Sequence, residues 1–273
     1  MTANLDARKV ERTRRNERLD VRVSAAERGL FEEAATLTGR TVSDFLRDTA
    51  TTSARMLLAD RTRFTVEPER WAAFADALDR EPRYLPRLGA FLAEASVLQA
   101  PVTYGPVVPI TTSHVTERFD CGSPAQTLWL RRHALQAHRT DSSRVRVVTH
   151  MGDHDVVGYY ALSAGGAEPA GVPVRVAKGM PRYPIPVVIL TRLGVHLDEQ
   201  GKGLGRALLK DALVRVAAAS EEIAARALLV HCEDEAARRF YERFGEFEPS
   251  PLDPLHLYLL VSDLRRTLLP PQP

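Results

Sequence analysis

The chain has 273 residues, 44% of them hydrophobic and 26% charged, which at about 100 to 200 residues per domain predicts one large or two small globular domains and excludes a disordered or fibrous protein. The net charge of +2 excludes a uniformly basic or acidic surface, so any surface for nucleic acid must be local. Because the only cysteines are Cys121 and Cys232 and no apolar segment exceeds strand length, we expect a cytoplasmic protein with reduced thiols.

A basic arm lies near the start of the chain. Residues 8–22 hold seven Arg or Lys side chains and three acidic ones, which is typical either of a solvated tail or of a segment that contacts nucleic acid. Residues 18–23 alternate polar and apolar side chains, with Leu19, Val21 and Val23 on one face. This pattern predicts a short, half-buried strand.

Two helices are predicted after this strand. Ser24 and Glu27 have the spacing of a capping box, and Gly39 is placed to end the first helix at its C′ position. A second helix is expected to begin near Thr41 or Ser43. One strand and two helices cannot close a core, because a lone strand leaves its backbone groups unpaired. We therefore expect a homodimer in which the strand pairs with its symmetry mate.

The run RVSAAERGLFEEAATLTGRTVSDFLRDTA, residues 22–50, resembles the ribbon-helix-helix domain of TacA-type antitoxins. A two-stranded ribbon can enter the major groove of DNA with its outward side chains toward the base edges. The resemblance implies operator DNA as a partner, with Arg18, Asp20 and Arg22 in the groove. Asp20 can accept a hydrogen bond from a cytosine amino group, but it otherwise weakens the positive field near the phosphates.

A neutralising segment is predicted at residues 64–98. An extended piece is followed by a helix that begins at Pro68, and apolar side chains recur at helical spacing. These recurring apolar side chains allow two interpretations, a helical extension that packs on its own helices or a segment that wraps another domain. The tail RFTVEPERWAAFADALDREPRYLPRLGAFLAEASVL resembles the tails with which TacA-like antitoxins wrap their toxins, which favours wrapping. The expected neutralising side chains are Trp71, Phe74, Leu78, Leu85 and Leu88.

A glycine loop follows the most apolar predicted strand. Residues 199–206, EQGKGLGR, lie between the strand predicted at 186–195 and an amphipathic helix. Glycines let the backbone approach a ligand, and the amides at a helix start form an anion site suited to a diphosphate. The alternative is a tight turn without a ligand. The loop has neither the Gly-Lys-Ser/Thr of a P-loop nor the Gly-x-Gly-x-x-Gly spacing of a dinucleotide site.

The spacing Gln200-x-x-Gly203-x-Gly205 instead resembles the pyrophosphate loop of the GNAT acyltransferases. The runs PRYPIPVVILTRLGVHLDEQGKGLGRALLKDA and FYERFGEFEPSPLDPLHLYL resemble the TacT-like toxins within that fold. One departure is Glu246, which stands between Gly245 and Phe247 where the family has Gly-Phe, and it predicts a bulged strand. The resemblance implies acetyl-CoA as the co-substrate, bound by Leu193, Gly194, Val195, Gln200, Gly201, Lys202, Gly203, Leu204, Gly205, Arg206 and Asp234.

The expected fold class is α+β, a ribbon-helix-helix with a helical extension followed by a GNAT domain around a mostly antiparallel sheet. We expect a DNA-binding part at 1–63, the neutralising segment at 64–98, a Pro-rich linker at 99–112 and the GNAT domain at 113–273. The resemblance implies a toxin–antitoxin fusion that acetylates the amine of aminoacyl-tRNA and blocks translation. Two alternatives are an acetyltransferase of a small amine or protein lysine, and a repressor that senses acetyl-CoA through an inactive GNAT fold.

The chemistry of such a transfer needs an acid more than a base. The amine of an α-amino ester has a pKa near or below about 7.7 to 8.0, so part of it is neutral at pH 7. Backbone amides at 193–195 would polarise the acetyl carbonyl. The spacing of Tyr241 with Phe240 and Phe244 is typical of a core aromatic. The resemblance instead implies that Tyr241 is the general acid that protonates the CoA thiolate, and we adopt that interpretation.

Basic side chains gather in sequence near the expected active-site end of the sheet. They are either solvated or hold an RNA backbone, and the expected tRNA-binding residues are Lys178, Arg182 and Arg192. No histidine has the spacing of a metal ligand, so we expect no metal.

Overall fold

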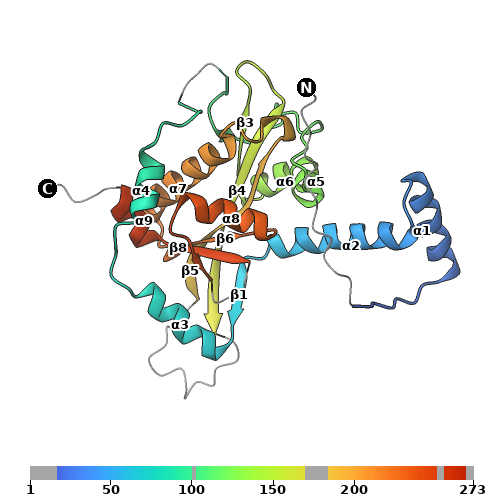
Figure 1. The fold of residues 1–273 in the computed structure, drawn as a ribbon, viewed down its shortest axis with the longest axis horizontal. Helices are drawn as coiled ribbons and strands as arrows, with labels where there is room; N and C mark the ends of the chain where they lie inside the picture. Colours follow the sequence, from blue (N-terminus) through green and yellow to red (C-terminus); the bar gives the residue numbers. More distant parts are fainter. Residues whose placement is uncertain (1–16, 100–102, 170–183, 251–254, 269–273) are drawn as a thin grey trace, which may run out of the picture. The chain divides into compact units, whose positions relative to one another are not determined.

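The computed structural model describes residues 17–99, 103–169, 184–250 and 255–268. The chain divides into two compact units, Met1–Ala50 and Thr51–Pro273 (Figure 1). The boundary falls inside helix α2 (Val42–Ala59), which is earlier than the predicted end of the DNA-binding part at residue 63.

The first unit contains α1 (Ala25–Leu37) and the beginning of α2. The Ser24 hydroxyl accepts a hydrogen bond from the Glu27 amide at 3.3 Å, and the Glu27 carboxylate accepts one from the Ser24 amide at 2.7 Å. Gly39 follows the C-cap residue Thr38 with a φ of +64°, a left-handed conformation that glycine adopts without strain. The predicted capping box and C′ glycine are therefore confirmed.

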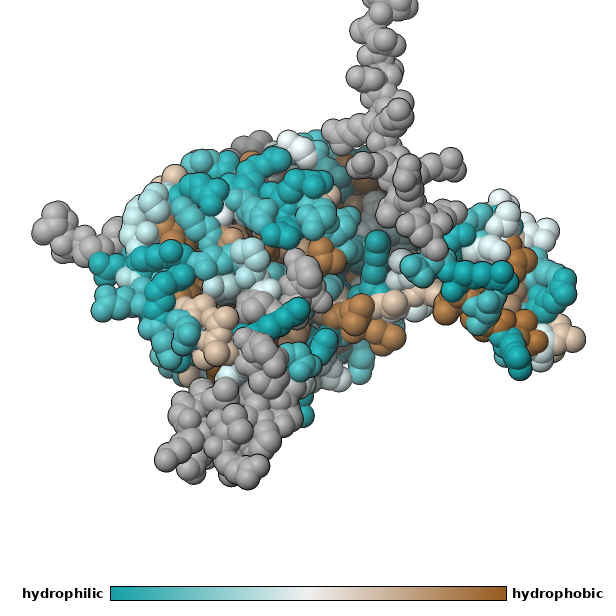
Figure 2. All heavy atoms as spheres, turned by 60° about the horizontal axis from the view of Figure 1, so that its bottom comes forward, coloured by the Kyte–Doolittle hydropathy of each residue, from teal (hydrophilic) through white to brown (hydrophobic). Residues whose placement is uncertain are grey.

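The strand predicted at residues 18–23 is not formed in the single chain. The described residues 17–24 have no regular structure, and Leu19, Val21 and Val23 are 89%, 70% and 43% exposed. Figure 2 shows apolar side chains at the surface of the molecule. On α1, Leu30 and Leu37 are 63% and 81% exposed. A strand needs a partner for its backbone groups, and this unit offers no other strand among its described residues.

In its described residues, the second unit is built on an eight-stranded sheet with the order β2-β3-β4-β5-β6-β8-β7, and β1 pairs with β4 off this path. Among the described strands, only the pairs β5–β6 and β1–β4 are parallel. The expected mostly antiparallel sheet is therefore confirmed. The strands are β1 (Arg63–Val66), β2 (Val108–Pro109), β3 (Arg144–Thr149), β4 (Val156–Pro169), β5 (Ile185–Val195), β6 (Ala227–His231), β7 (Glu248–Pro249) and β8 (His256–Leu260).

Helices cover both faces of this sheet (Figure 1). Alternate residues of β5 belong to different cores, since Val187 and Ile189 pack with α3 whereas Leu190 packs with α7. The cluster around α7 also includes α4, α8 and α9. The helices are α3 (Pro68–Leu78), α4 (Pro86–Ala93), α5 (Pro124–Arg132), α6 (Ala134–Arg139), α7 (Leu204–Glu222), α8 (Glu235–Phe244) and α9 (Val261–Leu268).

The neutralising segment packs on both faces of the sheet. On one face, Trp71 and Phe74 of α3 are fully buried against strands β5, β6 and β8. On the other, Leu88 and Phe91 of α4 join the core formed by α7, α8 and α9. All five neutralising side chains predicted from the sequence are at most 4% exposed. Within the single chain, the predicted segment therefore packs against both faces of the sheet, and its neutralising role stays a prediction.

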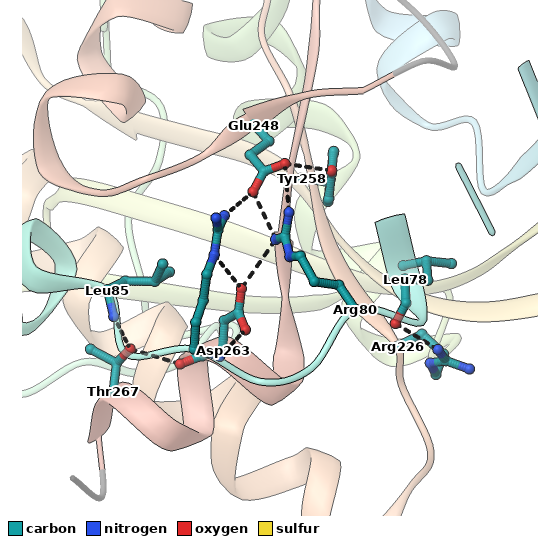
Figure 3. Close-up of polar contacts among 9 residues, drawn as sticks. Leu78, Arg80, Leu85, Arg226, Glu248, Tyr258, Asp263 and Thr267 are labelled. Atoms are coloured by element: carbon teal, nitrogen blue, oxygen red, sulfur yellow. Dashed lines mark hydrogen bonds and ion pairs between the residues drawn. The ribbon is translucent and has the colours of Figure 1, made fainter. Parts of the chain in front are cut away.

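Polar contacts fasten the connection between α3 and α4 to β7 and α9 (Figure 3). The guanidinium of Arg80 donates to Glu248 at 2.8 Å, and the backbone amide of Arg83 donates to Asp263 at 2.8 Å. Burial raises the pKa of Glu248, but hydrogen bonds from Arg80 and Tyr258 outweigh this effect and hold it below its ordinary value. Asp263 is 1% exposed, so displacing Arg83 would leave a buried carboxylate short of a hydrogen-bond donor.

The extra residue Glu246 caps α4. Its carboxylate accepts hydrogen bonds from the amides of Arg87 at 2.8 Å and Leu88 at 3.1 Å, which are among the first amides of that helix. The predicted bulge is not found, because β7 begins two residues later and pairs with β8 without a register shift. The residue that departs from the family pattern therefore binds the neutralising segment.

Part of the predicted linker belongs to the sheet. β2 pairs with β3, and Tyr104 is 4% exposed and donates a hydrogen bond to Glu199 at 2.6 Å. Proline content alone predicted an extended spacer, but apolar residues between the prolines supply an edge strand. The domain around the sheet therefore begins before residue 113.

Candidate active site

A cavity of the second unit opens where β5 and β6 separate. The two strands pair from Val187 with Ala227 to Leu190 with Val230, after which β5 continues beside β4 alone. Thr191 is the extra residue at an irregularity in the β4–β5 pairing, and such bulges bend a strand. The resulting cavity has a volume of about 600 Å³. It is lined by Leu193, Gly194 and Val195 on β5 and by His231 and Glu233 at the end of β6.

The glycine loop forms another wall of this cavity. Gly201 and Gly203 have φ values of +80° and +88°, and α7 begins immediately after Gly203. The side-chain amide of Gln200 donates to the carbonyls of Cys121 and Val195, each at 3.0 Å, and so fixes the loop to its surroundings. Backbone amides at the start of this 19-residue helix can bind a diphosphate.

Tyr241 lines the same cavity from α8 and is 5% exposed. Burial raises the pKa of its phenol well above the ordinary value, and the neighbouring Cys232 raises it further. The hydroxyl therefore stays protonated at neutral pH, and because the raised pKa also makes it a weaker acid, it donates a proton only to a strongly basic group.

Polar side chains that the sequence analysis did not single out line the side near β6. The Ser123 hydroxyl donates to the Glu233 carboxylate at 2.8 Å, and Gln126 lies in the first turn of α5. His231 is hydrogen-bonded to His256 at 2.7 Å. Ser123 could be recognised in the sequence as the cap of α5, but its partner lies 110 residues away, and no local signal indicates that pair.

Comparisons with known proteins agree with this geometry. Residues 18–96 match the family model described as Antitoxin TacA 1-like, and residues 143–245 match that of the Acetyltransferase (GNAT) domain. The tRNA-acetylating toxin of Mycobacterium tuberculosis is 46% identical over 147 residues, which cover 54% of this chain and 86% of that protein. The chain belongs to the TacT-like family of GNAT toxins.

The N-terminal part of this TacT-like protein resembles the antitoxins. Antitoxin TacA of Mycobacterium tuberculosis is 32% identical over 93 residues, which cover 34% of this chain and 59% of that protein. The crystal structure of AtaTR bound with AcCoA is 28% identical, with a TM-score of 0.54, and the match covers 61% of this chain and 98% of that one. Antitoxin-like and toxin-like parts are thus joined in one chain.

Three residues predicted to bind acetyl-CoA do not line the GNAT cavity. Lys202 forms an ion pair with Glu199 at 3.1 Å, and Leu204 is 1% exposed in the core beneath α7. The Asp234 carboxylate accepts a hydrogen bond from the Ala237 amide at 2.8 Å and so caps α8. Their places in the motif predicted a binding role, but their side chains have structural contacts. The predicted residues that line the cavity are Leu193, Gly194, Val195, Gln200, Gly201, Gly203, Gly205, Arg206 and Tyr241.

The prediction that Arg192 binds tRNA is wrong for the folded chain. Its side chain is buried, lies 5.0 Å from the ring centre of Trp129, and forms an ion pair with Asp60 at 2.8 Å. Burial lowers the pKa of Arg192, an effect that Asp60 partly offsets. A buried, paired guanidinium cannot contact a phosphate backbone. Lys178 and Arg182, predicted with it, lie outside the described residues.

The three residues predicted to bind DNA are exposed in the single chain. Arg18 and Asp20 form a solvent-exposed ion pair at 3.0 Å, and Arg22 lies near them in sequence. Within the described residues, no group of three or more His, Cys, Asp or Glu side chains could hold a metal ion. No helix in the described part of the chain is long and apolar enough to cross a membrane.

We expect Gly203→Asp to weaken acetyl-CoA binding about tenfold or more. The substitution forces a side chain into a left-handed conformation and puts a negative charge where the diphosphate would bind. Calorimetric titration with acetyl-CoA measures the effect. Gly152→Asp is the matched control, since Gly152 also has a positive φ of +78° and does not line the cavity. Equal affinities of the two variants would contradict the assignment of the loop.

Proposed function

We propose that this chain is a toxin–antitoxin fusion that transfers the acetyl group of acetyl-CoA to the primary amine of aminoacyl-tRNA and so blocks translation. The observation that carries the proposal is one cavity bounded by the splayed β5, the glycine loop and the buried Tyr241 hydroxyl. The relative named a tRNA-acetylating toxin supports the substrate class, and the AtaTR structure with AcCoA supports the co-substrate.

The proposed transfer uses groups that the cavity already presents. Those amides of Leu193–Val195 that do not pair with β4 polarise the acetyl carbonyl and stabilise the oxyanion of the tetrahedral intermediate. The neutral fraction of the α-amine attacks the carbonyl carbon, so no strong base is needed. As the intermediate collapses, the C–S bond breaks and Tyr241 protonates the leaving thiolate, while the proton released by the attacking nitrogen passes to solvent and solvent restores the Tyr241 hydroxyl. The glycine loop holds the diphosphate of CoA.

The end of the neutralising segment lies on that loop. The Glu94 carboxylate forms an ion pair with Arg206, and the Glu94 carbonyl accepts a hydrogen bond from Lys210 at 2.6 Å. Val97 packs so close to Gly203 that a side-chain carbon there would lie 3.4 Å from it. Because Arg206 and Gly203 line the cavity, the antitoxin part restrains the acetyl-CoA side of the toxin part.

The DNA-binding function belongs to the first unit. Its match to the TacA model, and its exposed Leu19, Val21 and Val23, support a homodimer in which two such segments form a ribbon. Arg18, Asp20 and Arg22 then face operator DNA. Since charged tRNA is a cytoplasmic substrate, the protein acts in the cytoplasm.

A chain that begins at Thr103, incubated with labelled acetyl-CoA and bulk charged tRNA, tests the proposal. We expect label on the α-amine of the esterified amino acids and none on uncharged tRNA. Label on lysine peptides alone would support the protein-lysine alternative. Absence of transfer to any amine, with operator binding by the full chain that changes with acetyl-CoA, would support the sensor.

A further inference from the structure

Glu233 holds the one carboxylate among the described residues that line the cavity. It lies between the end of β6 and Asp234, the cap of α8, and its side chain is 15% exposed. The arginines that line the same cavity are Arg206 and Arg243, so Glu233 supplies its negative charge. A carboxylate in a partly enclosed cavity attracts a cation more strongly than one at an open surface.

One neighbour orients the Glu233 carboxylate through a hydrogen bond, and another forms an ion pair with it. Ser123 on the toxin part donates to Oε1 at 2.8 Å. A guanidinium nitrogen of Arg55, which belongs to α2, donates to the same oxygen at 3.1 Å. The Arg55 side chain is 45% exposed, so the ion pair is partly solvated and a competing cation can displace it.

A second contact holds this stretch of α2 beside the splayed strand. The Arg192 guanidinium donates to the Met56 carbonyl at 3.0 Å and to Asp60 at 2.8 Å. Arg192 lies in β5 just before the residues that line the cavity. The end of α2 is therefore anchored on β5, and one turn of helix earlier Arg55 reaches Glu233.

We propose that Glu233 binds the protonated amine of the acceptor and that Arg55 occupies this position in the intact chain as an internal substitute for that cation. The inference rests on the proposed function, because it assigns an amine acceptor to the cavity. Glu233 draws the ammonium form into the cavity, Ser123 keeps its oxygen in place, and the neutral amine reacts after its proton is lost to solvent. The antitoxin part thus blocks the acceptor side through Arg55, separately from its contact with the glycine loop.

The test measures by NMR titration how tightly the full chain binds glycine methyl ester, a small α-amino ester without tRNA. We expect Arg55→Ala to bind the ester about tenfold more tightly than the unchanged chain, since a charge-assisted hydrogen bond becomes available. Arg47→Ala is the matched control, because Arg47 lies on the same helix and pairs with Asp44. Adding Glu233→Gln to Arg55→Ala should abolish the gain in ester affinity. The acetyl-CoA affinity of every variant should stay within about twofold of that of the unchanged chain.

Glu233→Gln preserves the shape of the side chain and can still accept from Ser123, so a folding defect does not explain a loss. No gain with Arg55→Ala, or a gain that survives Glu233→Gln, would overturn the inference. Charged tRNA is then offered to Arg55→Ala. If the ester binds through Glu233 and is acetylated whereas charged tRNA is not, the inference stands and the proposed function fails. If Arg55→Ala and the double variant Arg55→Ala/Glu233→Gln both acetylate charged tRNA with the same acceptor KM, the inference fails and the proposed function stands.

Discussion

Replacing Tyr241 with phenylalanine is expected to lower acetyl transfer by about 10²- to 10⁴-fold, the usual contribution of a general acid. Only the phenolic hydroxyl is removed, and the glycine loop is untouched, so acetyl-CoA affinity should change by less than about threefold. Single-turnover assays on charged tRNA with the chain that begins at Thr103 measure the transfer, and calorimetry measures the affinity.

The matched control is Tyr258→Phe. Tyr258 is also a buried tyrosine, but its hydroxyl donates to Glu248 at 2.7 Å and it does not line the cavity. Its loss should affect stability and leave the chemical step unchanged. A Tyr241→Phe protein whose transfer rate stays within a few-fold of the parent would refute the role of Tyr241 as the acid.

Combining Trp71→Ala with Phe74→Ala in the full chain should free the toxin part and lower the melting temperature. Both side chains are 0% exposed, and truncating a buried aromatic typically costs about 3–5 kcal/mol. Because α3 packs directly on β5, β6 and β8, this loss loosens the segment from the sheet. We expect Tyr241-dependent growth arrest and a rise in tRNA acetylation. Leu57→Ala, which removes a side chain that is 75% exposed, is the control.

The same comparison includes the chain that begins at Thr103, with residues 64–98 supplied separately. Within one chain, a tethered segment has an effective concentration of about millimolar, so dilution does not release it. Added in trans, the segment should suppress acetylation, and it should do so less well with both substitutions. Equal acetylation by the full and the shortened chain would show that the N-terminal part only binds DNA.

Features that depend on near neighbours could be predicted from the sequence. The Ser24–Glu27 capping box needs two residues three positions apart, and the glycine loop was predicted from the strand before it and the helix after it. The apolar spacing of α3 likewise predicted which side chains would be buried. The resemblance to GNAT proteins then placed Tyr241 in the cavity, where spacing alone indicated a core residue.

Features that depend on distant partners could not be predicted from the sequence. Arg192 looked like a free cation because its partner Asp60 lies 132 residues earlier in the chain. Glu246 looked like a disturbance of a strand, but it binds amides 158 and 159 residues away. The ribbon strand at 18–23 needs a second molecule. In each case a partner far away in the sequence determines what the side chain does, and the local sequence pattern does not identify that partner.

The strand β1 has a consequence for how the toxin part is made. It pairs in parallel with the last four residues of β4, from Gly166 to Pro169, and continues the edge formed by β3. An uncovered edge strand invites pairing with other chains and aggregation. Synthesis proceeds from the N-terminus, so β1 leaves the ribosome before β4 does. In this chain the strand that covers the edge precedes β4 and is covalently attached to it, so we expect each newly made edge to be covered without a second molecule.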